Sequence, residues 1–241
     1  MSNTTVVTPG ATPGQQTFDW KSAARLIDHT LLKPDAIREQ VAVLCREAIA
    51  YHFFSVMVNP SNIAQAVSLV SGTDVKVGTV IGFPLGANTT QAKLAEAADA
   101  LLLGAHELDM VINIGALKSG SRTLVQTEIK LLANKCHDGN AILKVILENC
   151  LLTTDEKLLA CQMCAEAGAD FVKTSTGFST SGATAADVSL MRGVVGHKLG
   201  VKAAGGIRTA ADLQVMVNAG ADRIGASASV AIVKELGAPE L

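Results

Sequence analysis

Short runs of β-branched and apolar residues alternate along the chain with longer segments rich in alanine and leucine. This alternation is typical of βαβ units, in which helices connect the strands of a parallel sheet. The strand starts are separated by roughly 20 to 35 residues, which leaves room for one helix per unit but not for a second domain. Eight strands are predicted: LIDHT from Leu26, SVMVN from Ser55, KVGTVIGF from Lys76, ELDMVINI from Glu107, LKVILE from Leu143, FVKTS from Phe171, VKAAG from Val201 and RIGAS from Arg223.

The helix boundaries between these strands carry their own signals. Helices are predicted to end at glycines that can adopt the left-handed conformation, namely Gly104, Gly168 and Gly220. Helices are predicted to begin where a threonine precedes an acidic residue by three positions, because both side chains can satisfy free amides of the first turn. These pairs are Thr153 with Glu156, Thr184 with Asp187 and Thr209 with Asp212.

Eight strands that alternate with helices fit either a closed (β/α)8 barrel or an open doubly wound sheet. The open sheet is disfavoured because the dinucleotide-binding pattern GxGxxG is absent and eight even repeats close naturally. We therefore predict an α/β fold, a (β/α)8 TIM barrel, in a single domain over residues 18–241. Residues 1–17, rich in Thr, Pro, Gly and Gln, are expected to form a disordered N-terminal tail.

Composition and charge exclude several classes of protein. Only 3% of the residues are aromatic, the formal net charge is −2 and no basic stripe is present, so we expect no nucleic-acid partner. We also expect no membrane segment and no signal peptide, which indicates a cytoplasmic protein. Five scattered cysteines favour a reducing compartment, and the Cys161-x-x-Cys164 pair lies inside a predicted helix rather than at a redox turn.

Charged residues inside the predicted strands are the main chemical signal. Lys76 begins its strand and is expected to be solvated, whereas five others lie inside or late in their strands. In this fold chemistry gathers at the carboxyl ends of the strands. A single buried Asp–Lys pair can be purely structural, but three lysines beside one aspartate on consecutive strands leave an excess of positive charge. The five residues are Asp28, Asp109, Lys144, Lys173 and Lys202.

An excess of buried positive charge predicts one lysine with a lowered pKa. Burial and neighbouring ammonium groups both disfavour the charged form, and a fall from about 10.4 to about 7 would give a free amine at neutral pH. Such an amine attacks carbonyl carbon and forms a Schiff base. We predict Lys173 as this nucleophile because hydroxyls and amides follow it, Lys202 as the ammonium that lowers its pKa, and Asp109 as the group that moves protons with Lys202.

The loops after the last strands indicate a phosphate site. Loops seven and eight of this fold bind phosphate through backbone amides and a helix N-terminus. No P-loop, HExxH motif, zinc-spaced Cys/His set or acidic metal cluster is present, so we expect no metal. His29 could be catalytic, but a structural histidine is the favoured interpretation. The predicted phosphate-binding residues are Gly177, Gly205, Gly206, Gly225 and Ser227.

Six separated motifs together resemble the deoxyribose-phosphate aldolase family, the cofactor-independent class I aldolases, from residue 20 to 236. The resemblance implies a (β/α)8 barrel that reversibly cleaves 2-deoxy-D-ribose 5-phosphate to D-glyceraldehyde 3-phosphate and acetaldehyde through a lysine imine. It implies Lys173 as the imine lysine, Asp109 and Lys202 as the proton-handling pair, and supporting roles for Lys144, Asp28, Thr30 and Thr176. The motifs are LIDHTLLKPDA, VIGFPLGANTTQAK, ELDMVINIGALKSG, LKVILE, FVKTSTGF and VKAAGGIR.

Three positions depart from the family pattern. Met57 stands where some members have a cysteine that aldehyde-derived adducts attack, which predicts greater tolerance of aldehyde. Phe178 stands where some members place a lysine near the phosphate, so a cationic contact is lost there. Ala228 replaces a serine that follows Ser227 in other members, and this leaves one hydroxyl fewer.

Two other functions stay open on the residues alone. A metal-free barrel isomerase or synthase would share the phosphate loops without needing a lysine of lowered pKa. A non-catalytic phosphosugar sensor would bind without turnover. For the aldolase the expected partners are small-molecule phosphosugar and aldehyde substrates, and the family resemblance suggests a homodimer.

Overall fold

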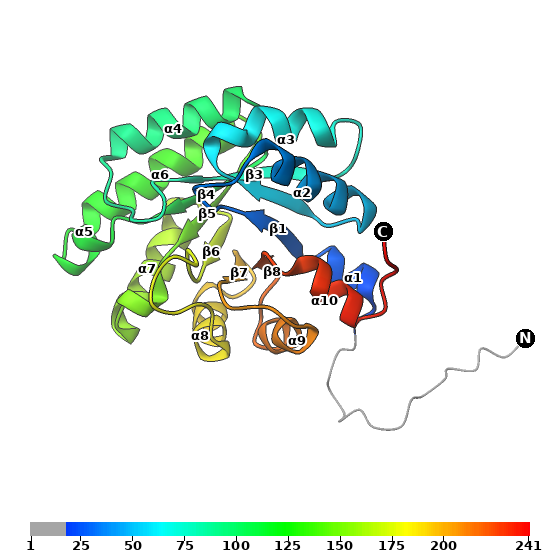
Figure 1. Ribbon diagram of the computed structural model, residues 1–241. Coiled ribbons are helices and arrows are strands. Elements are labelled where there is room, and N and C mark those ends of the chain that lie inside the picture. Colours follow the sequence, from blue (N-terminus) through cyan, green and yellow to red (C-terminus); the bar gives the residue numbers. More distant parts are fainter. Residues whose placement is uncertain (1–17) are drawn as a thin grey trace, which may run out of the picture.

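The computed structural model describes residues 18–241, so the expectation for residues 1–17 lies outside the described residues. Eight parallel strands form a closed barrel in sequence order, with helices around it (Figure 1). The predicted α/β TIM barrel is therefore confirmed. The strands are β1 (Ile27–Leu31), β2 (Ser55–Val58), β3 (Lys76–Ile81), β4 (Glu107–Val111), β5 (Ile142–Ile146), β6 (Phe171–Lys173), β7 (Gly200–Ala204) and β8 (Arg223–Ala226).

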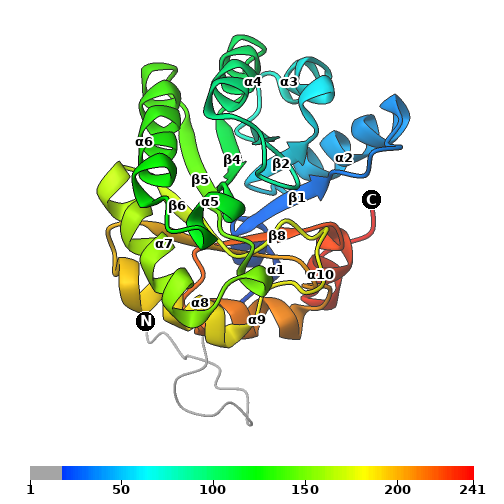
Figure 2. The same cartoon turned by 90° about the vertical axis from the view of Figure 1, so that its left-hand side faces the viewer.

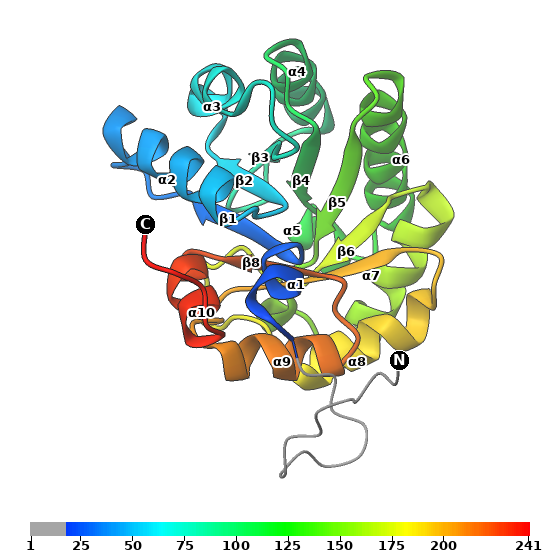
Figure 3. The same cartoon turned by 90° about the vertical axis from the view of Figure 1, so that its right-hand side faces the viewer.

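Most helices cover the outside of the barrel, and two short helices lie at its ends. Helix α1 lies across the end where the strands start (Figure 3), whereas the short α5 lies at the end where they finish (Figure 2). The helices are α1 (Trp20–Ala24), α2 (Arg38–Ala50), α3 (Ile63–Val70), α4 (Thr90–Leu102), α5 (Ile114–Lys118), α6 (Arg122–Asp138), α7 (Thr154–Ala167), α8 (Ala185–Val195), α9 (Ala210–Asn218) and α10 (Ser229–Glu235), with 3-10 turns η1 (Pro60–Asn62) and η2 (Asn149–Leu151).

The strands are buried on both faces, because helices cover one face and the barrel interior lies on the other. All residues of β2, β4 and β8 are buried, and only Lys76, at the start of β3, is exposed as expected. Apolar side chains from strands and helices form one continuous core around the barrel. Charged strand residues gather inside the barrel, which separates the chemistry from the apolar packing.

The predicted helix boundaries are largely confirmed. Capping boxes at Thr153 and Thr209 start α7 and α9, as predicted. Thr184 caps α8 alone, because the carboxylate of Asp187 pairs instead with Lys157 at 2.6 Å. The glycines predicted to end helices all have positive φ angles. The fourth strand is shorter than predicted, since the side chain of Asn113 accepts a hydrogen bond from Ala116 N and starts α5.

Within residues 18–241, no helix is both long enough and apolar enough to cross a bilayer. The five cysteines are free, and the Cys161-x-x-Cys164 pair is buried in α7 as predicted. Burial raises the pKa of Cys161 to about 12, so this thiol is a packing group rather than a nucleophile.

Candidate active site

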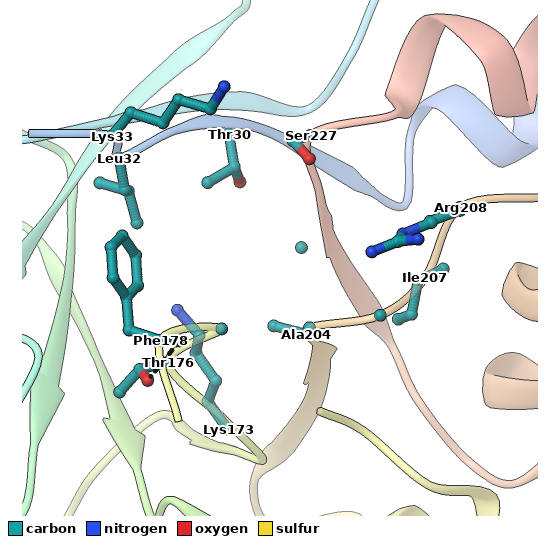
Figure 4. Close-up of a pocket in the computed structure, with 14 residues that line it drawn as sticks. Thr30, Leu32, Lys33, Lys173, Thr176, Phe178, Ala204, Ile207, Arg208 and Ser227 are labelled. Carbon is teal, nitrogen blue, oxygen red and sulfur yellow. Dashed lines mark hydrogen bonds between the residues drawn. The ribbon is translucent and has the colours of Figure 1, made fainter. Parts of the chain in front are cut away.

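A cavity of about 380 Å³ opens at the end of the barrel where the strands finish. The ends of β1, β6, β7 and β8 and the loops after them form its wall (Figure 4). It brings together the predicted nucleophile and every residue predicted for phosphate binding. The predicted residues in its wall are Thr30, Lys173, Thr176, Gly177, Gly205, Gly206, Gly225 and Ser227.

Four other predicted residues lie below this cavity, in the barrel interior. They are at most 1% exposed, and strand register fixes their heights. Lys173 lies opposite Lys202 on β7 and opposite Ile146 on β5, which places it two residues above the level of Lys144. The register pairs Lys202 with Lys173, but of these three lysines Lys173 is the one whose side chain lines the cavity. The four interior residues are Asp28, Asp109, Lys144 and Lys202.

One carboxylate connects the three lysines. Asp109 Oδ2 accepts hydrogen bonds from the Nζ atoms of Lys173 and Lys202, both at 2.8 Å. Asp109 Oδ1 accepts a hydrogen bond from Lys144 Nζ at 2.9 Å. Burial opposes the charge on Asp109, but the neighbouring lysines outweigh it and hold the pKa of Asp109 well below its usual range. Asp109 is thus a charged link between all three amines.

Two charged residues of this network are missing from the sequence prediction. Glu107 accepts a hydrogen bond from Lys144 at 2.6 Å, and Arg223 donates to Asp28 at 2.5 Å and contacts Glu107 at 3.3 Å. Both begin their strands, at the same nominal position as the exposed Lys76. They could have been found from the register, because barrel shear carries the first residues of β4 and β8 into the interior.

These two residues correct the predicted charge balance. The interior holds four basic side chains and three acidic ones, rather than three lysines beside a single aspartate. Asp28 pairs with Lys202 at 2.5 Å and with Arg223, and these cations overcome its burial and lower its pKa. The cluster becomes electrically neutral when a single lysine gives up its proton.

Lys173 is the residue whose surroundings favour that loss. Its pKa is lowered to about 8, chiefly because burial disfavours the ammonium, while Asp109 opposes the shift and Lys202 adds to it. The prediction named repulsion from Lys202 as the main cause and about 7 as the pKa. The direction of the pKa shift agrees with the prediction, but burial rather than repulsion is the larger cause.

Asp28 does not reach the cavity, whereas Thr30 does. The Asp28 carboxylate accepts a hydrogen bond from Ser55 Oγ at 2.6 Å in addition to its two ion pairs. Thr30 lies two residues later on β1, and its side chain is in the cavity wall. Any support from Asp28 therefore passes through Lys202 rather than through direct contact with a bound molecule.

The backbone amides at the start of α9, which were predicted to bind phosphate, already have a partner within the protein. The backbone amides of Arg208 and Thr209 donate to Asp212 Oδ2 at 2.9 and 3.0 Å, so the capping box already occupies them. The side chain of Arg208, which the sequence prediction omitted, extends into the cavity from the side opposite Phe178 (Figure 4). The cavity thus offers a guanidinium group where the prediction relied on a helix N-terminus.

The three departures from the family pattern occupy different places. Phe178 lines the cavity, half exposed, and its ring packs edge-on against Phe83 at 5.3 Å. Met57 is buried with Leu32 and Val80. Ala228 directly precedes α10 and makes no side-chain cap there.

His29 is held by structural contacts, as favoured from the sequence. Its Nε2 pairs with Glu47 at 2.8 Å, and its ring packs against Phe53. Among the described residues, no group of three or more His, Cys, Asp or Glu side chains is arranged to hold a metal ion.

The site combines a buried lysine that lines a barrel cavity with a carboxylate that also binds a second lysine, and an amine of lowered pKa is a nucleophile towards carbonyl carbon. The profile of the DeoC/LacD family aldolases matches residues 22–235, and the chain belongs to this family. It is therefore a lyase of the aldolase type. The family resemblance drawn from the six motifs is confirmed.

Curated relatives and solved structures agree with this membership. Deoxyribose-phosphate aldolase from Clostridium kluyveri is 54% identical over 218 residues, which cover 90% of this chain and 100% of the relative. The enzyme of that name from Lysinibacillus sphaericus is 56% identical over 213 residues, which cover 88% and 95%. The deoxyribose phosphate aldolase structure from Aeropyrum pernix, described as tetrameric, has a TM-score of 0.84 at 37% identity, and the match covers 89% of this chain and 91% of that one.

Proposed function

We propose that the chain reversibly cleaves 2-deoxy-D-ribose 5-phosphate to D-glyceraldehyde 3-phosphate and acetaldehyde through an imine on Lys173. The observation that carries this proposal is the lysine of lowered pKa at the floor of a cavity whose far side presents Arg208. The names of the curated relatives support the same substrate.

Lys173 acts as the nucleophile in this mechanism. Its neutral amine adds to the aldehyde carbon of the open-chain sugar, and loss of water gives the iminium. The bond between C2 and C3 then breaks as a base removes the proton of the C3 hydroxyl, and its electron pair moves into the iminium to form an enamine. D-Glyceraldehyde 3-phosphate leaves, and protonation and hydrolysis of the enamine release acetaldehyde and restore Lys173.

Asp109 and Lys202 handle protons beside this reaction. Asp109 Oδ2 contacts both amines at the same distance of 2.8 Å, so a proton can pass between them with little movement. Lys144 holds the other oxygen of Asp109 and stops the carboxylate from rotating. Asp28 in turn fixes Lys202.

The substrate phosphate is placed at the glycine loops and Arg208. Gly205, Gly206, Gly225 and Ser227 form one side of the cavity together with the Arg208 side chain. Guanidinium groups bind phosphate through paired hydrogen bonds. This cation compensates for the phenylalanine at position 178.

The remaining expectations belong to the same proposal. The chemistry needs only side chains of the chain, so no metal or cofactor takes part. We further propose that the protein works in the cytoplasm on small molecules; a homodimer is one assembly to test, beside the tetramer described for the Aeropyrum pernix relative.

One assay tests the substrate, the metal independence and the nucleophile together. Acetaldehyde release from 2-deoxy-D-ribose 5-phosphate is measured in the presence of a chelator, with Lys173→Leu as the control. Borohydride treatment in acetaldehyde should add a two-carbon unit to Lys173. An unmodified Lys173 in an active enzyme would overturn the mechanism.

A further inference from the structure

The loop after β5 contains a buried carboxylate that the mechanism above does not use. Glu148 is 2% exposed and lies beside a small side hollow of about 100 Å³ that shares Thr176 and Phe178 with the main cavity. Burying a carboxylate is costly unless hydrogen bonds or charges compensate it. Its partners therefore indicate what it is for.

All close partners of the Glu148 carboxylate belong to Thr176. The backbone amide of Thr176 donates to both carboxylate oxygens at 3.3 Å, and the Thr176 hydroxyl donates to Oε2. The weak contact from Cys150 Sγ, at 3.9 Å, adds little. Glu148 thus acts on the turn that follows the proposed nucleophile.

The backbone of Glu148 is also strained. Its φ is 57°, in the left-handed region that non-glycine residues seldom adopt. The other described non-glycine residues with positive φ, His52 and Asn140, lie in turns that precede strands, at the opposite end of the barrel. Strain of this kind persists at functional sites where surrounding contacts fix it.

We propose that Glu148 is a positioning residue that fixes the direction of the Thr176 hydroxyl, so that Thr176 accepts a hydrogen bond from a hydroxyl of the substrate. A threonine hydroxyl has one proton to donate and two sites to accept. Glu148 takes the proton, and Phe178 N donates to one accepting site at 3.0 Å. One accepting site is left for the cavity, which Thr176 lines. This inference rests on the proposed function.

The direction of the hydrogen bond from Thr176 to Glu148 determines which substrate group Thr176 can bind. Thr176 cannot donate to a phosphate oxygen while Glu148 holds its proton, so it selects a hydroxyl group instead. The chain of donors runs from substrate hydroxyl to Thr176 and then to Glu148, and each bond strengthens the next. Acetaldehyde carries no hydroxyl, so imine formation with acetaldehyde does not need this chain.

The first experiment separates the effect of Glu148 on sugar-phosphate binding from any effect on imine formation at Lys173. Glu148→Gly accepts the left-handed backbone without strain and removes the carboxylate, whereas Glu148→Gln keeps one accepting oxygen. We expect Glu148→Gly to raise KM for 2-deoxy-D-ribose 5-phosphate about tenfold with little change in kcat, and Glu148→Gln to recover most of the loss. Borohydride trapping of acetaldehyde on Lys173 should stay within about twofold of the unmodified protein.

The second experiment tests the hydroxyl itself in the synthetic direction. Acetaldehyde is condensed with D-glyceraldehyde 3-phosphate or with 3-oxopropyl phosphate, which lacks the hydroxyl. The unmodified protein should prefer the hydroxylated acceptor by about tenfold in kcat/KM, and Glu148→Gly and Thr176→Val should each lose that preference. Glu166→Ala, at a glutamate on the exposed side of α7, is the control for loss of a carboxylate.

Three results with the single variants would overturn the inference. The first is an unchanged KM in Glu148→Gly. The second is an equal loss of acetaldehyde trapping and sugar cleavage in a variant that circular dichroism shows to be folded. The third is a preference for the hydroxylated acceptor that persists in both Glu148→Gly and Thr176→Val. If instead the unmodified protein releases no acetaldehyde from the sugar phosphate, it is the proposed function that fails. Additive effects of Glu148→Gly and Thr176→Val in a double-mutant cycle would also contradict the inference.

Discussion

Two buried lysines, Lys93 in the helix layer and Lys173 in the barrel, have similar burial but different surroundings. Lys93 is 0% exposed, donates to Glu128 at 2.6 Å and to the carbonyl of Val111 at 2.8 Å. Lys173 is 3% exposed and shares Asp109 with two other lysines. Burial is the main cause of a lowered pKa for both.

The difference between them lies in access and in the counter-ion. Lys93 has a carboxylate that serves no second lysine, and its side chain lies so close to Gly82 that a β-carbon there would come within 2.7 Å of it. Lys173 borders a cavity of about 380 Å³. A lowered pKa therefore marks a candidate nucleophile only when the amine also faces space for a substrate.

The largest expected effect comes from exchanging each lysine for methionine and comparing the reactions. Lys173→Met should lower cleavage of 2-deoxy-D-ribose 5-phosphate on the order of 10⁴-fold and abolish borohydride trapping at this position, because methionine has no amine to form the imine. Rates are measured by coupled detection of acetaldehyde, and trapping by peptide mass. Residual trapping at another lysine would contradict the assignment of Lys173 as the nucleophile.

Lys93→Met should act on stability instead. It leaves Glu128 buried without its partner, which is expected to lower the free energy of unfolding by about 3 to 5 kcal/mol. Denaturant titration measures the loss, and the folded variant should still trap acetaldehyde on Lys173. Lys93→Met combined with Glu128→Leu should recover most of the stability, and no recovery would argue against the ion pair as the cause.

The pH dependence of imine formation sharpens the contrast further. Lys173 reacts as the neutral amine, so trapping should increase with pH through about 8 and level off above it. Lys202→Met removes a charge that disfavours the ammonium, so the midpoint should move upward by about one pH unit, or about 1.4 kcal/mol. Initial trapping rates from pH 6 to 10.5 give both midpoints. A downward shift would show that Lys202 does not lower the pKa of Lys173.

The smallest effect is expected from adding a lysine at the cavity wall. Phe178→Lys places an exposed ammonium opposite Arg208, and exposed ion pairs contribute less than about 1 kcal/mol. KM for 2-deoxy-D-ribose 5-phosphate should fall about two- to fivefold at low salt and return towards the original value at high salt. Phosphate-free 2-deoxy-D-ribose serves as the control, and an equal fall in its KM would exclude a charge effect.

The sequence predicted the barrel because its strands and helices differ in period, composition and end signals. It predicted Lys173, Lys202 and Asp109 because charge in a buried strand is unusual in any arrangement. Glu107 and Arg223 escaped because a charged first residue of a strand is ordinarily solvated, and barrel shear alone carries these two inside. Arg208 and Glu148 escaped because loop residues reach the site through three-dimensional geometry that has no period along the chain.

The two carboxylate oxygens of Asp109 bind different lysines. Oδ1 binds Lys144 deep in the barrel, while Oδ2 binds the amines of Lys173 and Lys202, to which we assign the reaction. A redesign that keeps every residue in contact with the substrate could therefore still lower activity if it replaced Lys144. Without Lys144, the Asp109 carboxylate would be free to rotate. Anyone reshaping this catalyst for new aldehydes should treat the floor of the barrel as fixed and vary the rim.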